Sequence, residues 1–421
     1  MEFIVFMNFA ISVIFTLCYF YQFIYVFVGL VKKSKTFNES KKHKYAIVVS
    51  ARNESNVIGN LIASIKRQEY PSELIDVFVV ADNCTDDTAE VARKAGATVY
   101  ERFNTELVGK GYALDWMFNL IQTEHGEKNY DAYIVFDADN VVAPTFVAEM
   151  NKVFDNGYRV ITSYRNSKNY GENWITAGYS LWFLREAKFL NNARMSLGTS
   201  SAISGTGFLV SAEIIKKNGG WIHHLLTEDI EFTTDSIIQG EKIGYCEKAV
   251  LYDEQPTTFY QSYLQRLRWS RGFYQVFRKY GKKLIVNVFK GCFSCYDMLM
   301  TLMPAMLLTL LSVVVNIVAI PVAIITQLDG WLMLLETLGR TILSFYLIFF
   351  FLGAITTVTE WKQIHCPKFK KIAYIFTFPL FMLTYVPISI IALFKNVKWE
   401  PIKHSVSKSI AEICEDEDVQ A

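Results

Sequence analysis

Apolar residues follow two patterns along this chain. Long stretches with almost no charge lie near the N-terminus and in the C-terminal third, and shorter apolar runs alternate with helix-like periodicity between them. About 20 consecutive apolar residues are enough for a helix to cross a bilayer. We therefore predict membrane spans at Phe3–Val31, Met298–Leu328, Trp331–Thr359 and Ile372–Phe394.

The region from Lys41 to about Lys248 has the alternating pattern of an α/β domain. This alternation predicts a mostly parallel sheet with helices on both faces, and ligands bind such sheets outside the carboxyl ends of the strands. Thr85 is a candidate N-cap for the second helix. The expected strands are Tyr45–Ala51, Leu74–Ala81, Ala97–Glu101 and Tyr133–Phe136, and the expected helices are Asn56–Arg67, Asp86–Ala95 and Lys110–Gln122.

The charges around the apolar stretches give conflicting topologies. Three lysines between Lys32 and Lys35 place the end of the first span in the cytoplasm. Three further spans would put the C-terminus outside, yet Lys362–Lys371 and Lys395–Lys403 are both basic and favour the inside. One C-terminal stretch is therefore expected to be a bent hairpin or two short spans, with Met298–Leu328 and its two prolines the first candidate.

Composition narrows the class of protein. Hydrophobic residues make up 52% of the 421 and charged residues 20%, as in a membrane protein, and the net charge of +1 carries no information about partners. The segment 256–296 is basic and amphipathic, which predicts an interfacial helix and gives no support for nucleic-acid binding. The seven cysteines are scattered, which does not favour a zinc site.

Two acidic motifs carry candidate chemistry. Asp137 and Asp139 form a D-x-D pair directly after an expected strand, a pattern that suits a hard divalent cation. Glu228 and Asp229 precede the helix-like stretch Ile230–Gln239, where they either cap the helix with Thr227 or supply a carboxylate that accepts a proton.

The sequence QRLRW at Gln265–Trp269 is the third and most specific motif. On a helix, Gln265, Arg268 and Trp269 share one face. An arginine there can bind diphosphate oxygens as a bidentate fork, and the tryptophan offers a flat apolar surface to a sugar.

The order D-x-D, TED, QRLRW between apolar stretches resembles the membrane-embedded processive glycosyltransferases of family 2, which include cellulose, chitin, hyaluronan and poly-N-acetylglucosamine synthases. The resemblance implies a GT-A-type fold and a Mg2+ or Mn2+ cofactor on Asp137 and Asp139. It also implies a general base at Asp229 beside Glu228, and an acceptor sugar over Trp269. The residues that it places around the donor are Ala51, Glu54, Asp82, Lys110, Asp137, Gln265 and Arg268. Gly205, Thr206 and Gly207 are expected either to face the acceptor or to form a simple tight turn.

The expected function is inverting transfer of a sugar from a UDP-sugar to a growing β-linked glycan, with export and a possible homo-oligomer or export partner. Two alternatives stay open: transfer of one sugar to a lipid, and a non-catalytic sugar-nucleotide sensor or exporter subunit. The expected location is a bacterial plasma membrane, with the catalytic domain cytoplasmic. The expected divisions are 1–40 (anchor), 41–255 (catalytic domain), 256–296 (QRLRW and interfacial helices), 297–396 (membrane region) and 397–421 (tail).

Overall fold

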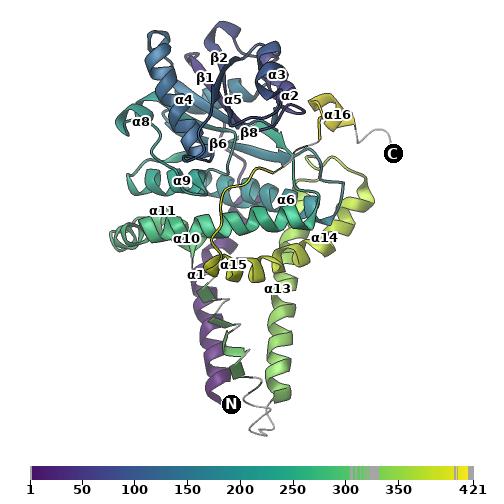
Figure 1. The fold of residues 1–421 in the computed structure, drawn as a ribbon. Helices are drawn as coiled ribbons and strands as arrows, with labels where there is room; N and C mark the ends of the chain where they lie inside the picture. The colour runs from purple at the N-terminus through teal and green to yellow at the C-terminus, as the bar shows by residue number, and fades with distance from the viewer. Residues whose placement is uncertain are drawn as a thin grey trace.

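The computed structural model describes residues 2–303, 331–402, 404 and 406–415, together with part of 307–321. Figure 1 shows an α/β body at the top, a layer of nearly horizontal helices beneath it, and two long helices that extend downward side by side. The two long helices are α1 (Glu2–Val31) and α13 (Trp331–Thr359).

An eight-stranded mixed sheet forms the body, in the order β3-β2-β1-β4-β7-β6-β8-β5. Strands β3, β2, β1 and β4 are parallel, as the alternation predicted, whereas β7 runs antiparallel to both of its neighbours. The α/β prediction is therefore confirmed, with a more mixed sheet than expected. The strands are β1 (Tyr45–Ala51), β2 (Ile75–Asp82), β3 (Thr98–Arg102), β4 (Ala132–Asp137), β5 (Val141–Val142), β6 (Val160–Ser167), β7 (Phe208–Ser211) and β8 (Ile243–Asp253).

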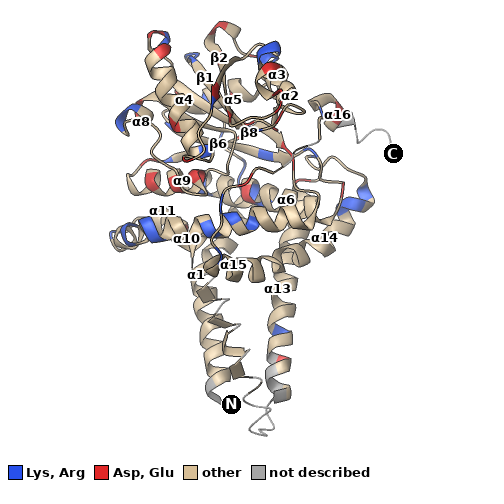
Figure 2. Ribbon diagram, in the orientation of Figure 1, with Lys and Arg blue, Asp and Glu red and all other residues tan. Residues whose placement is uncertain are grey.

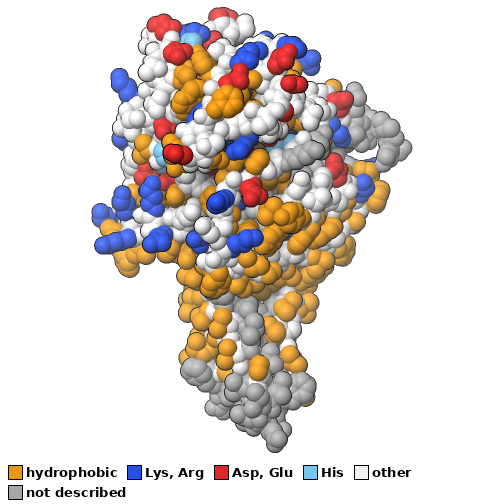
Figure 3. Space-filling view, in the orientation of Figure 1, with side chains coloured by type: hydrophobic (Ala, Val, Ile, Leu, Met, Phe, Trp, Pro, Cys, Tyr) orange, Lys and Arg blue, Asp and Glu red, His pale blue; other side chains and the backbone are white. Residues whose placement is uncertain are grey.

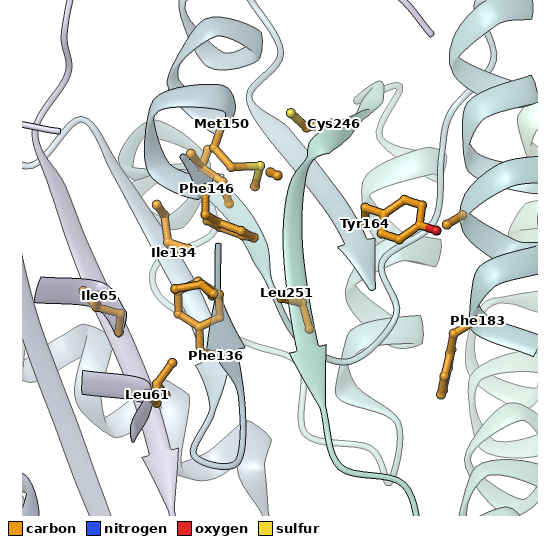
Figure 4. Close-up of a cluster of buried hydrophobic side chains, with 14 of the residues drawn as sticks. Leu61, Ile65, Ile134, Phe136, Phe146, Met150, Tyr164, Phe183, Cys246 and Leu251 are labelled. Carbon is orange, nitrogen blue, oxygen red and sulfur yellow. The ribbon is translucent and has the colours of Figure 1, made fainter. Parts of the chain in front are cut away.

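Helices cover both faces of this sheet. Successive residues of β1 pack into different clusters, because side chains alternate across a strand: Ile47 and Val49 in one, Ala46 and Val48 in the other. Figure 4 shows part of the first cluster, where Phe136 of β4 meets Leu61 and Phe146. The helices of the body are α2 (Ile58–Lys66), α3 (Thr88–Lys94), α4 (Lys110–Glu124), α5 (Phe146–Asp155), α6 (Trp174–Arg185), α7 (Asn192–Leu197), α8 (Ala212–Lys217) and α9 (Glu228–Ile238), with a π-helix at Glu186–Asn191.

The predicted cap at Thr85 was wrong. Helix α3 begins at Thr88, whose backbone N–H donates to the Asp86 carboxylate, and its N-cap Asp87 makes no side-chain cap bond. Thr85 instead donates its backbone N–H to Oδ1 of Asn53 at 2.8 Å. Asn53 has a φ of 58°, and its side chain thus joins the loops that follow β1 and β2.

The layer beneath the body contains α10 (Phe259–Phe289), α11 (Phe293–Leu302), α14 (Lys368–Leu383) and α15 (Tyr385–Phe394). Figure 1 shows α15 lying along α10, across the direction of α1 and α13. Arg271 of α10 donates to the carbonyl oxygens of Ala392 and Leu393, and Tyr274 donates to that of Ser389.

Three helices of the described chain are long and apolar enough to cross a membrane: Ile4–Val31, Leu338–Thr359 and Lys368–Phe394. The third is divided at Thr384 into α14 and α15, and the chain after it returns to the body, where Val406 donates its N–H to Glu254. The irregular stretch is thus Ile372–Phe394. Our first candidate, Met298–Leu328, begins inside α11 and otherwise lies largely outside the described residues, as does the tail after Glu415. Within α13, Glu336 and Arg340 lie four residues apart and form an ion pair.

Helix α1 is joined to the body by a buried ionic cluster. Arg194 of α7 forms two hydrogen bonds, of 2.7 and 2.9 Å, with the carboxylate of Asp297 on α11. Tyr21 and Tyr25 of α1 donate to the same carboxylate at 2.9 and 2.8 Å. One aspartate therefore holds three separate segments together.

We predict that Asp297→Asn lowers the free energy of unfolding by about 3 kcal/mol, because it leaves the buried Arg194 without a counter-charge. Thermal unfolding in detergent measures this loss. The control is Asp76→Asn, whose half-exposed pair with Lys128 should contribute less than about 1 kcal/mol. Equal losses in both variants would show that the cluster does not anchor α1.

Candidate active site

A cavity of about 920 Å3 lies at the carboxyl ends of β1, β2 and β4 and extends down to α1 and α13. Its volume falls in the range of about 300–1,000 Å3 that is common for ligand sites. The three motifs, far apart in sequence, meet on its wall. The expected site residues that line it are Ala51, Glu54, Asp82, Lys110, Asp137, Asp139, Gly205, Glu228, Asp229, Gln265, Arg268 and Trp269.

The D-x-D pair occupies the turn that ends β4. Asp137 is the last residue of the strand, and its N–H donates to Oγ1 of Thr206 at 2.9 Å. Asp139 is 5% exposed and accepts a 2.9 Å hydrogen bond from the N–H of Glu254. Burial opposes its ionisation, but the positive charges of His404 and Lys168 outweigh that effect and lower the pKa of Asp139. This carboxylate is therefore held in its charged form.

Lys110, the first residue of α4, connects the first two motifs. Its Nζ lies 2.5 Å from Oδ1 of Asp137, 2.8 Å from the carbonyl oxygen of Gly205 and 3.9 Å from Oε1 of Glu228. The next residue, Gly111, allows this approach, since a Cβ there would lie 2.3 Å from the carbonyl oxygen of His223. The G-K-G sequence thus lets α4 begin close to the loop before Glu228.

The TED acids begin α9 and share the buried cavity wall. Thr227 is the N-cap residue but makes no side-chain cap bond, so the predicted cap interaction was wrong. Burial raises the pKa of Glu228 to about 7. The negative charges of Asp229 and Asp137 add to the shift, and the positive charge of Lys110 opposes it. Burial also raises the pKa of Asp229. The pair is thus suited to exchange a proton near neutral pH.

The QRLRW residues lie on α10 and divide into two roles. Arg268 lines the same cavity as the acids, and its Nε has no hydrogen-bond partner among the described residues. Trp269 also lines the cavity and is fixed by edge-on contacts with Tyr179 and Phe183. Arg266 is fully buried and donates to Phe381 and Thr384, so it holds α10 against α14 and α15.

Only the first residue of the expected acceptor loop reaches the cavity. Gly205 lines it with a φ of 76°, and a Cβ there would lie 3.9 Å from Oδ2 of Asp229. Thr206 is 2% exposed and turns toward Asp137 and Asn140, while a Cβ on Gly207 would overlap Leu251. Thr206 and Gly207 thus support the turn of Asp137 and do not line the cavity.

Sequence analysis missed the part of the wall formed by β6 and β8. Arg165 of β6 is paired with Asp253 at the end of β8, and both line the cavity. Burial raises the pKa of Asp253 to about 6. The positive charge of Arg165 opposes this shift, and the negative charges of Asp139 and Asp137 add to it. The sequence contained a signal for this part of the site. Asp253 and Glu254 come directly after an apolar run, as Asp137 comes after the apolar residues of β4.

The C-terminal strap, defined here as residues 397–409 without 403 and 405, lines the cavity beside Arg52 and Glu54. The ring of Trp399 lies 5.3 Å from the guanidinium of Arg52 and 5.9 Å from that of Arg268. Nδ1 of His404 lies 2.8 Å from Oε1 of Glu54.

The residues around Asp139 suit a divalent cation. No group of three His, Cys, Asp or Glu in the described chain is already arranged as a complete metal site. Nevertheless Oε2 of Glu54 is buried without a described hydrogen-bond partner, and Asp137, Asp139 and His404 line the same cavity. Metal-binding histidines usually donate their second ring N–H to a carboxylate, as His404 can to Glu54. Asp137 and Asp139 would hold the metal, with ligand oxygens completing its shell. His404, positively charged beside the acids, would join them as a ligand only by giving up its proton.

This fold and site define a glycosyltransferase. The chain matches the family described as "Glycosyltransferase like family 2" over residues 43–272, more than half its length, and it belongs to that family. A mannosyltransferase from Pyrobaculum calidifontis, solved with GDP-Man and Mn2+, has the same fold, with a TM-score of 0.57, 15% identity and coverage of 93% of this chain and 99% of that one.

Curated relatives include enzymes that act on lipids. A β-monoglucosyldiacylglycerol synthase from Nostoc is 28% identical over 61% of this chain and 54% of its own length. A probable glycosyltransferase from Bacillus subtilis is 23% identical over 62% of this chain and 64% of its own. A 4,4'-diaponeurosporenoate glycosyltransferase from Staphylococcus aureus is 46% identical over 16% of this chain and 17% of its own. The match with the first relative spans about half of that protein.

We predict that His404→Ala weakens Mn2+ binding by about tenfold or more, the usual effect of losing a residue that binds or orients a metal. Titration of free Mn2+ by electron paramagnetic resonance measures the affinity. His125→Ala is the control, because His125 contacts Phe78 and Tyr100 away from the cavity. Unchanged affinity in His404→Ala would exclude the strap from the metal site.

Proposed function

We propose that this chain transfers a single sugar from a UDP-sugar to a hydroxyl group of a membrane lipid. The observation that carries the proposal is the shape of the cavity. It begins at the acids of the D-x-D and TED motifs and continues between α1 and α13, where its wall includes Phe15, Phe345 and Leu352. An acceptor that reaches Asp229 through this opening passes between two helices of membrane-spanning length.

The proposed reaction needs no protein nucleophile. Asp229 accepts the proton of the acceptor hydroxyl as its oxygen forms a bond to the anomeric carbon of the sugar. The bond from that carbon to the diphosphate breaks, and its electron pair leaves with UDP. Lys110 and Arg268 place positive charge near the departing diphosphate. A divalent metal, when bound at Asp137 and Asp139, stabilises the same negative charge.

The relatives support these assignments. The Nostoc enzyme is a synthase of a glucosylated diacylglycerol, and the Pyrobaculum structure contains a nucleotide sugar with Mn2+. We extend to this chain the lipid acceptor of the first and the divalent metal of the second.

Processive synthesis of a glycan, with or without an export partner, is the second candidate. The QRLRW motif and the position of Trp269 on the cavity wall favour it. Each sugar of a glycan carries hydroxyl groups that need hydrogen-bond partners when buried. The wall between α1 and α13 is mostly apolar in its described part, which suits a hydrocarbon chain better. The intact acids of the D-x-D and TED motifs argue against a non-catalytic sensor.

The proposed membrane position follows from the charges. Figure 2 shows Lys and Arg along α10 and few charges on the lower parts of α1 and α13. Figure 3 shows hydrophobic side chains around the lower half of the molecule. Phe289 at the end of α10 is 86% exposed, and Phe394 at the end of α15 is 84% exposed. We place α1 and α13 across the bilayer and α10, α11 and α15 at its cytoplasmic surface, so that the strap and the catalytic body share one side.

The test is UDP release by the purified protein in lipid nanodiscs with Mn2+ and a panel of UDP-sugars, followed by mass analysis of the products. A lipid that carries one sugar is the expected product. A long polymer would favour the second candidate, and no UDP release from folded protein would contradict both.

We predict that Asp229→Asn lowers kcat by about 10²–10⁴-fold, because it removes the proposed general base. UDP release under saturating donor and acceptor measures kcat. The isosteric change keeps the shape of the cavity, so nucleotide binding should persist. Activity near the wild-type level would exclude Asp229 as the base.

We predict that kcat/KM rises with pH through about 7, where the Glu228–Asp229 pair loses its proton. A base must be unprotonated, so activity is lost as the pH falls below this value. Lys110→Gln should move this acidic limb to higher pH, because removal of a positive charge raises the pKa of both acids. Lys94→Gln on exposed α3 is the control, and an unshifted limb in Lys110→Gln would assign the titration to another group.

A further inference from the structure

Arg185, at the end of α6, is a buried cation that the proposed mechanism does not use. It is 6% exposed and lines the cavity where the cavity passes α1. Its Nη2 donates to Oε1 of Gln22 at 2.8 Å, whereas Nε and Nη1 have no hydrogen-bond partner among the described residues. Burial lowers its pKa to about 10. Burying a guanidinium whose N–H groups have no acceptor costs free energy, unless a ligand accepts those hydrogen bonds.

Two other arginines of the same cavity are paired with acids. Arg165 is paired with the buried Asp253, and Arg194 with the buried Asp297. Within the described chain no ion pair joins Arg185 to an acid, and the adjacent Glu186 accepts a hydrogen bond from Ser204. The fold has thus neutralised two of these cations and left the third directed at the cavity.

The surroundings of Arg185 indicate which kind of ligand would bind its free N–H groups. Gln22 of α1 is its partner, and the ring of Trp182 lies 4.9 Å from its guanidinium. The apolar wall between α1 and α13 begins beside it, while the D-x-D acids line another part of the cavity. A ligand here is therefore amphipathic. Guanidinium groups bind the oxygens of phosphate and carboxylate as a fork.

We propose that the acceptor is an anionic lipid whose phosphate or carboxylate binds Arg185. Its hydroxyl reaches Asp229, and its apolar chains lie between α1 and α13. The anionic group is not consumed in the reaction and serves to recognise the acceptor. This inference rests on the proposed lipid transfer and adds the chemical class of the lipid.

The experiment compares acceptors in nanodiscs of phosphatidylcholine, with the UDP-sugar that the protein turns over. Diacylglycerol offers a hydroxyl without charge, phosphatidylglycerol adds a phosphate, and glucuronosyl-diacylglycerol adds a carboxylate. Glycerol phosphate in solution tests the anion without the chains. We expect kcat/KM for a charged lipid to exceed that for diacylglycerol by about tenfold or more, as one charge-assisted hydrogen bond provides. Glycerol phosphate should be a poor acceptor.

Arg185→Met should abolish this preference, so that the ratio of kcat/KM for a charged lipid to kcat/KM for diacylglycerol falls to about one, and Arg185→Lys should retain part of it. Loss of an unpaired buried charge should not lower the melting temperature, whereas loss of a purely structural arginine would. Lys188→Met is the matched control, since Lys188 lies three residues on and pairs with Glu247 outside the cavity. It should keep the preference of the wild type.

Three outcomes would overturn the inference: no preference in the wild type, an equal loss for all acceptors in Arg185→Met, or destabilisation of that variant. In the first case, single-sugar transfer to diacylglycerol would leave the proposed function intact. UDP release with no lipid product would instead contradict the proposed function itself.

Discussion

Mutual repulsion among carboxylates is the constraint on which this structure depends. The cavity wall contains Asp137, Asp139, Glu228, Asp229 and Asp253, and such acids cannot all ionise in a shared low-dielectric space without compensating cations. Lys110, Arg165 and His404 supply that charge from α4, β6 and the C-terminal strap. Because each cation comes from a different segment, the electrostatic balance of the site requires the complete fold.

The same constraint gives the acids different properties. Asp139 accepts a backbone N–H and lies among cations, so its pKa is lowered, whereas the buried TED acids have raised pKa values. One carboxylate thus stays charged and suits a metal, and the other pair is suited to exchange a proton near neutral pH. Similar residues therefore take different chemical roles within a single cavity.

The buried cluster at Asp297 connects the catalytic body to α1, one of the two long apolar helices. It fixes α1 against α7 and α11, and α1 in turn provides Gln22 as the partner of Arg185. Interactions outside the three motifs therefore fix the position of the apolar part of the cavity relative to its polar part. A lipid acceptor would meet both parts at once.

The sequence by itself determined the α/β class, strand β1 to the residue, and the gathering of Asp82 and Asp137 at one sheet edge, since the carboxyl ends of parallel strands meet there. It also identified the three motifs that share the cavity. Tertiary structure alone decided that Thr206 turns away from the cavity, that His404 returns to Glu54, and that Arg185 is left without an acid. It also laid α15 along α10, although hydropathy marks that stretch as a span. The reason is physical: local patterns encode periodicity and apolar length, whereas the partner of a buried charge or of a long apolar helix is chosen by contacts hundreds of residues apart.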